Sequence, residues 1–123
     1  MLNSTLAALS EALAGKRISS VELTRLYLDR IRALNPQLNA FISVDESVSL
    51  AQARVADERR SRGEAGPLTG IPVAHKDIFC ARGWRTTCGS RMLENFIAPY
   101  DAHLIGNFDR AGAVMLGKTN MDE

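Results

Sequence analysis

Apolar residues recur at helical spacing along the first sixty residues, which predicts a helical N-terminal half. The first stripe ends at Gly15, a residue that commonly closes a helix. Ser19 and Glu22 have the spacing of a capping box, so a second helix begins there. Its apolar stripe ends before Pro36, whose ring and missing N–H oppose a further helical turn. The apolar positions of the first stripe are Leu2, Leu6, Leu9 and Leu13.

A short extended piece at residues 40–44 precedes a third predicted helix at residues 45–62. This helix has a thin apolar line, so we expect most of its circumference to face water. The line consists of Val48, Ala51 and Val55. Glycine and proline then gather in GEAGPLTG, residues 63–70, which is the clearest break in the chain.

The pattern changes after this break. Residues 71–77 are too short for a helix and predict a strand, and the unbroken apolar run 113–116 predicts a parallel strand buried on both faces. Between them, Asp101 can cap a helix that closes at Gly112 and buries Leu104, Ile105 and Phe108. Strand, helix and strand in this order imply a right-handed crossover. The irregular segment between residues 77 and 101 is long for a connection, which indicates a functional reason for it.

The predicted fold class is therefore α/β: N-terminal helices followed by the first strands of a mixed, mainly parallel sheet flanked by helices. We expect residues 1–123 to be the N-terminal part of a single domain. Within it, residues 1–62 form a helical layer, residues 63–70 a linker and residues 71–123 the start of the sheet. Two recognisable strands rarely make a stable sheet alone, so we expect a larger protein or self-association to cover the open edges.

Composition narrows the function classes. The 123 residues include 15 basic and 14 acidic ones, for a net charge of +1, which gives no electrostatic reason to expect nucleic acid or a membrane as a direct partner. No apolar run reaches the roughly 20 residues that span a bilayer, and the N-terminus lacks the basic region of a signal peptide. Cys80 and Cys88 are then expected to be reduced thiols in a cytoplasm.

The segment GIPVAHKDIF, residues 70–79, contains a lysine, Lys76, flanked by apolar residues. Burying an ammonium is costly unless it is paired or loses its proton. Lys76 is therefore either a structural residue paired with a carboxylate or a neutral base. Asp77 is poorly placed to be that partner, because adjacent residues of a strand point to opposite faces.

Other candidate groups have simpler explanations. Lys118 follows a buried strand and is expected to be solvated at the strand exit. His75 is expected to be a hydrogen-bonded core or interface residue, although it could serve Cys80 as the base of a thiol nucleophile. The aromatic residues of the long segment are expected to pack it down: Trp84, Phe96 and Tyr100. A charged helix face, solvated or in contact with another protein chain, contains Arg54, Arg59, Arg60 and Arg62. A metal site is disfavoured by the spacing of its possible ligands, His75, Cys80, Cys88 and His103.

Two segments carry a family resemblance: PLTGIPVAHKD at residues 67–77 and AGAVMLGKTN at residues 111–120. They resemble the amidase-signature family of amide hydrolases. Three further pieces, TCGS, LENF and APYDA within residues 87–102, are similar to one branch of it, the A subunits of the aspartyl/glutamyl-tRNA amidotransferases. The NPQLNAFISV stretch at residues 35–44 fits the same branch. The resemblance covers essentially the whole chain.

The resemblance implies that Lys76 is the base of a Ser–cis-Ser–Lys triad that hydrolyses glutamine and releases ammonia. A lysine can take a proton only when it is neutral, which desolvation by Val73, Ala74, Ile78 and Phe79 would favour. The family's glycine- and serine-rich segment, which supplies both serines, has no counterpart in these 123 residues. Ser90 lies outside the motif, so the chain is expected to be inactive alone.

The resemblance also implies partners: glutamine as substrate, the B and C subunits of the amidotransferase, and misacylated tRNA reached through the first of these two. No cofactor is expected on this chain, and ATP and Mg are used by the assembled complex. Two other functions stay open. One is a stand-alone amidase of the same family acting on small amides, and the other is a non-catalytic interaction module that docks through the open sheet.

Overall fold

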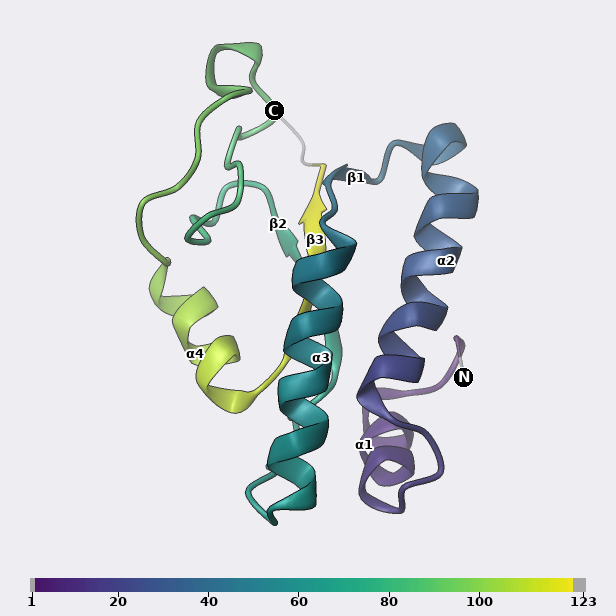
Figure 1. The fold of residues 1–123 in the computed structure, drawn as a ribbon. Helices are drawn as coiled ribbons and strands as arrows, with labels where there is room; N and C mark the ends of the chain where they lie inside the picture. The colour runs from purple at the N-terminus through teal and green to yellow at the C-terminus, as the bar shows by residue number, and fades with distance from the viewer. Residues whose placement is uncertain (1, 121–123) are drawn as a thin grey trace.

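The computed structural model describes residues 2–120 and has the α/β architecture that the sequence predicts (Figure 1). In chain order, the elements of the described residues are α1 (Leu6–Ala14), α2 (Ser20–Leu38), β1 (Phe41–Ser43), α3 (Glu46–Ser61), β2 (Pro72–Lys76), the 3-10 turn η1 (Arg91–Leu93), α4 (His103–Ala111) and β3 (Val114–Thr119). None of the helices in this part of the chain is long and apolar enough to cross a membrane.

The strands form one mixed sheet in the order β1-β3-β2. The central strand β3 runs parallel to β2 and antiparallel to β1. Residues 114–118 of β3 are all buried, which confirms the prediction of a covered parallel strand. The extended piece predicted at residues 40–44 is β1, and its pairing with β3 joins the helical half of the chain to the sheet.

Gly117 allows β1 to lie close to β3. A Cβ atom at this position would collide with the carbonyl oxygen of Ser43 and would lie 3.1 Å from the ring of Phe41. Only glycine, which has no Cβ, lets the backbones of β1 and β3 come this close.

The parallel pair contains a register shift. Val73 lies opposite Met115, but the next residue, Ala74, lies opposite Gly117. β3 therefore carries one extra residue at Leu116. Since side chains alternate along a strand, one extra residue turns every later side chain of that strand to the other face.

Helix α2 begins as predicted, with a complete capping box between Ser19 and Glu22. The prediction that it ends before Pro36 is wrong, because the helix continues to Leu38. Pro36 lies in the last turn, so its missing N–H removes one intrahelical hydrogen bond near the helix end, and only two helical residues follow it. Asn39 then ends the helix in the left-handed conformation, with φ of 52°, and its N–H donates to the carbonyl of Asn35 at 2.8 Å.

Helix α3 has the predicted extent, but its predicted apolar line is wrong. Val55 is 54% exposed, and the buried face consists of Leu50 and three residues smaller than valine: Ser49, Ala53 and Ala56. Small side chains let α3 pack closely between α2 and β3 (Figure 1). The hydroxyl of Ser49 donates to the carbonyl of Met115 at 2.5 Å, which satisfies a polar group inside this contact.

Helix α4 closes at Gly112 as predicted, with φ of 85° at that residue. Asp101 does not cap it: the N-cap residue is Ala102, and a carboxylate oxygen of Asp101 accepts the N–H of Arg82 at 2.7 Å instead. Of the residues predicted to be buried, Ile105 is buried, whereas Leu104 is 39% exposed.

The apolar core has three parts around the sheet. One joins α1 and α2 to the start of β2 through Leu9, Leu13, Leu23 and Ile71. A second joins α2 and α3 to β3 through Leu28, Leu50 and Leu116. The third packs α4 and the segment after β2 onto β3 through Ala81, Trp84, Ile105 and Met115. The carboxyl ends of β2 and β3 are thereby held beside the long segment 77–102 (Figure 1).

Candidate functional site

Lys76 is the last residue of β2, and its side chain is exposed in the described chain. Its two neighbours are buried: His75 is 5% exposed and Asp77 has no exposed surface. This alternation follows from strand geometry. The apolar residues expected to desolvate Lys76 do not bury it here, since Ala74 and Ile78 are themselves exposed. The role of Lys76 as a base stays a prediction.

The carboxylate of Asp77 points into the protein and accepts several donors. One oxygen, Oδ2, accepts the N–H of Thr87 at 3.2 Å, the hydroxyl of Thr87 and the N–H of Gly89 at 3.5 Å. The other, Oδ1, lies 3.5 Å from Nζ of Lys118. Hydrogen bonds and an opposite charge satisfy this buried carboxylate.

The turn at residues 87–89 has a backbone conformation that directs N–H groups toward the Asp77 carboxylate. Cys88 and Gly89 have φ of 53° and 69°, in the left-handed region. Successive residues in such a conformation turn their N–H groups toward a common anion. The N–H of Cys88 donates to the carbonyl of Asp77 at 3.3 Å, so the turn binds the backbone of that residue as well as its side chain.

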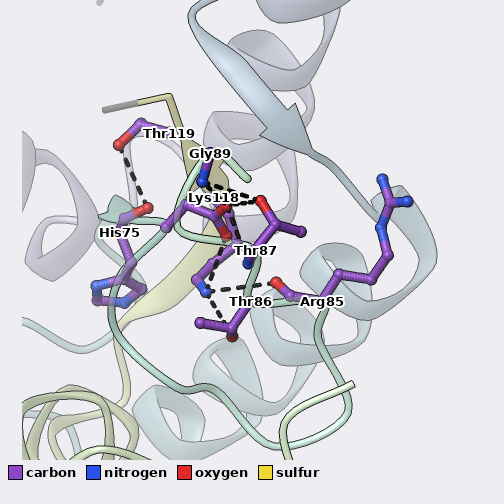
Figure 2. Close-up of polar contacts among 8 residues, drawn as sticks. His75, Arg85, Thr86, Thr87, Gly89, Lys118 and Thr119 are labelled. Carbon is purple, nitrogen blue, oxygen red and sulfur yellow. Dashed lines mark hydrogen bonds and ion pairs between the residues drawn. The ribbon is translucent and has the colours of Figure 1, made fainter. Parts of the chain in front are cut away.

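Lys118 is fully buried, which makes the prediction of a solvated lysine wrong. Figure 2 shows its Nζ among polar groups of the segment after β2. It donates to the hydroxyl of Thr86 at 3.0 Å and reaches the carbonyl of Arg85 at 3.5 Å, beside the ion pair with Asp77. Burial lowers the pKa of Lys118, and the charge of Asp77 opposes that decrease.

The register shift explains the orientation of Lys118. Without the extra residue in β3, Lys118 would lie opposite Lys76. With it, Lys118 lies opposite His75, and Thr119 lies opposite Lys76. The side chain of Lys118 therefore turns to the face that Asp77 occupies, away from that of Lys76.

His75 is a core residue, as predicted. Its ring packs edge-on against Phe108 of α4, with ring centroids 5.2 Å apart. Burial lowers the pKa of His75, and the positive charge of Lys118 lowers it further. The imidazole lines an open cavity together with three charged residues, Arg82, Asp101 and Asp109.

The remaining candidates are three aromatic residues and two cysteines. Trp84 is buried as predicted, but Phe96 and Tyr100 are 42% and 58% exposed, so the prediction that they pack the segment down is wrong. Cys80 and Cys88 are free thiols. A hydrogen bond with Cys80 raises the pKa of Tyr100. Across residues 2–120, no group of three or more His, Cys, Asp and Glu residues could hold a metal ion.

The arginines of α3 are not all solvated. Arg60 donates to the carbonyl of Thr69 at 2.9 Å, and Arg59 donates to the carbonyl of Arg110 at 3.4 Å. They hold the end of α3 to the loop before β2 and to the end of α4.

Comparison with known proteins gives the family. The Amidase family profile matches residues 22–123. The chain is 68% identical over all its residues to the A subunit of the glutamyl-tRNA(Gln) amidotransferase of Methylobacillus flagellatus and 63% identical to that of Nitrosospira multiformis. It spans 25% and 26% of the length of these curated relatives.

Solved structures agree. The native peptide amidase of Stenotrophomonas maltophilia matches 98% of this chain with 25% of its own, at 38% identity and a TM-score of 0.92. The helices and the three-stranded sheet of this chain are thus arranged as in the peptide amidase. The chain belongs to the amidase family.

Proposed function

We propose that this chain is the N-terminal part of the glutamine-hydrolysing subunit of a tRNA-dependent amidotransferase. That enzyme converts glutamate or aspartate on misacylated tRNA to glutamine or asparagine. The observation that carries the proposal is the 68% identity, across the whole chain, to the A subunit of a glutamyl-tRNA(Gln) amidotransferase.

In this proposal Lys76 is the base. It takes a proton through a bridging serine, and a second serine attacks the carboxamide carbon of glutamine. A glutamyl ester forms as ammonia leaves, and water then releases glutamate. In this proposal both serines come from the remainder of the protein, since the chain spans 25% of the length of the relative it matches.

A lysine works as a base only after it loses its proton, and water around it opposes that loss. Within residues 2–120, Lys76 is exposed and is the last residue of β2. The outer edge of β2 pairs with no other described strand. The proposal therefore requires the remainder of the protein to cover β2 and the face that Lys76 occupies. The open edge of β2 is suited to receive a further strand.

The other properties of the proposed complex follow the same resemblance. The ammonia serves the B and C subunits, and tRNA is reached through the first of these two. This chain binds no cofactor, while ATP and Mg act in the assembled complex. Its location is cytoplasmic.

The test uses the full-length protein co-purified with its partner proteins. Glutamate release from glutamine is measured for the parent and for Lys76→Gln. Lys16→Gln is the matched control, because Lys16 is also an exposed lysine and lies between α1 and α2. We expect Lys76→Gln to abolish hydrolysis and the control to retain it. Turnover by Lys76→Gln would refute the role of Lys76 as the base.

A stand-alone amidase is the second candidate, favoured by the 38% identity to the peptide amidase. The higher identity to the A subunits of the amidotransferases makes it the weaker one. The two differ in a pull-down: a component of the amidotransferase co-purifies with partners, whereas a stand-alone amidase hydrolyses small amides without them.

A further inference from the structure

We infer that the buried ion pair between Asp77 and Lys118 is a positioning device for Lys76. Neither residue touches the reacting atoms in this inference; both act by fixing the end of β2 from which Lys76 projects. The inference rests on the proposed function, since it gives the base at Lys76 a fixed direction.

The first step is that the backbone on both sides of Lys76 is held. The N–H of Asp77 donates to the carbonyl of Thr119 at 3.1 Å, which extends the pairing with β3 past the end of β2. The hydroxyl of Thr119 donates to the carbonyl of His75 at 3.3 Å. The carbonyl of Lys76 itself accepts the N–H of Phe79 at 3.1 Å.

The second step is that the side chain of Asp77 sets the rotation of the strand end. Asp77 and Lys76 project to opposite faces, so a carboxylate anchored in the interior directs the lysine outward. Lys118 holds one carboxylate oxygen and the turn at residues 87–89 holds the other (Figure 2). If the carboxylate were released, β2 could twist at its end and Lys76 would change direction.

The third step is that stability alone does not account for the pair. Both side chains have no exposed surface. The free energy lost by removing two charges from water offsets most of the free energy gained from their attraction. Apolar residues of similar volume would fill the same space at no such cost. Charges fix a geometry that apolar packing leaves free, because the hydrogen bonds have defined directions. Lys118 also reaches this position only through the register shift in β3.

The test is Asp77→Asn in the full-length protein with its partners. Asparagine keeps the size and one acceptor oxygen but removes the charge that holds Lys118. Because a displacement of about 1 Å at a reacting group costs on the order of 100-fold in rate, we expect kcat for glutamine hydrolysis to fall by about that factor. KM for glutamine is expected to stay within about threefold of the parent, because glutamine binding is not altered.

A matched control separates positioning from loss of stability. Ser49→Ala removes a buried hydrogen bond to the same central strand, at the carbonyl of Met115. Both variants are assayed well below their thermal midpoints. The control is expected to lower the midpoint and leave kcat unchanged. A kcat for Asp77→Asn within twofold of the parent would overturn the inference.

A milder variant decides the matter if Asp77→Asn does not fold. Thr87→Val removes the hydroxyl that donates to Asp77 and keeps both the shape of the side chain and the ion pair. It is expected to reduce kcat several-fold at an unchanged KM, and an unchanged kcat would overturn the inference. Lys76→Gln, measured in parallel, tells the two proposals apart. If it is active, the proposed base is wrong, whereas an inactive Lys76→Gln beside a fully active Thr87→Val refutes the positioning role alone.

Discussion

Lys118 of β3 lies opposite His75 of β2, not opposite Lys76, because β3 carries one extra residue at Leu116. This pairing puts the ammonium of Lys118 on the inner face of the sheet with Asp77, 3.5 Å from its carboxylate. It leaves the two lysines on opposite faces, so that the same pair of strands provides one buried structural cation and one exposed candidate base.

Replacing Lys118 with methionine is expected to destabilise the protein by about 3 kcal/mol, because the variant leaves the carboxylate of Asp77 buried without its counter-charge. Adding Asp77→Asn to Lys118→Met is expected to recover part of that loss, since no uncompensated charge then remains. Urea unfolding of the two variants measures both changes. If Lys118→Met alone were as stable as the parent, the ion pair would not be formed in solution.

Two glycines are expected to respond to alanine with opposite signs. Gly117→Ala should destabilise by about 1–3 kcal/mol, because its Cβ collides with the backbone of Ser43 and separates β1 from β3. Gly106→Ala should stabilise by about 0.5–1 kcal/mol, because Gly106 lies inside α4 and its Cβ meets only the flexible end of Arg110, at 3.4 Å. Thermal unfolding compares them. If Gly117→Ala were as stable as Gly106→Ala, the close approach of β1 would be wrong.

The features that the sequence predicted correctly are local. The capping box at Ser19 depends on residues three positions apart, and the strand over residues 71–77 depends on a short apolar run. The burial of β3 follows from its own composition. None of these needs knowledge of what the element packs against.

The features that the sequence missed depend on partners that lie far along the chain. The buried face of α3 is set by close packing against α2 and β3, which selects alanine and serine over the larger Val55. Asp101 bonds the backbone of Arg82, 19 residues away, instead of capping α4. The burial of Lys118 requires the register shift, which no pattern within β3 reveals. For the candidate site, the position of Lys76 at the end of β2 was predictable, whereas the network around Asp77 was not.

Asp57 of α3 is expected to stabilise α2, although it lies 36 and 37 residues along the chain from the residues it contacts there. Its carboxylate, on α3, accepts the N–H groups of Ser20 and Val21 at 2.8 and 3.2 Å, at the first turn of α2. Asp57→Ala leaves both donors without an acceptor, and the expected loss is about 1–2 kcal/mol. Glu58→Ala is the control, because Glu58 is an exposed acidic neighbour whose removal should change stability by less than about 0.5 kcal/mol. Equal losses in the two variants, measured by urea unfolding, would contradict a capping role for Asp57.

His75 is expected to make stability depend on pH in mildly acidic solution. Its folded-state pKa lies below the ordinary value of 6.5, because burial and the charge of Lys118 oppose protonation. Below pH 6.5 the unfolded chain therefore binds a proton at this site that the folded protein resists, and stability falls until the pH reaches the folded-state pKa. Above this range both states are neutral here and the effect disappears.

The measurement is the free energy of unfolding at about pH 5 and about pH 7.5, on either side of the ordinary histidine pKa, for the parent and for His75→Gln. Removing the imidazole should shrink the difference between the two pH values, because other groups titrate alike in both proteins. The charged residues that share its surroundings, Lys118, Arg82, Asp101 and Asp109, stay in place. His103→Gln is the matched control for the loss of a histidine, because His103 is exposed at the start of α4. If His75→Gln kept the full pH dependence of the parent, the imidazole would not be buried beside Lys118 in solution.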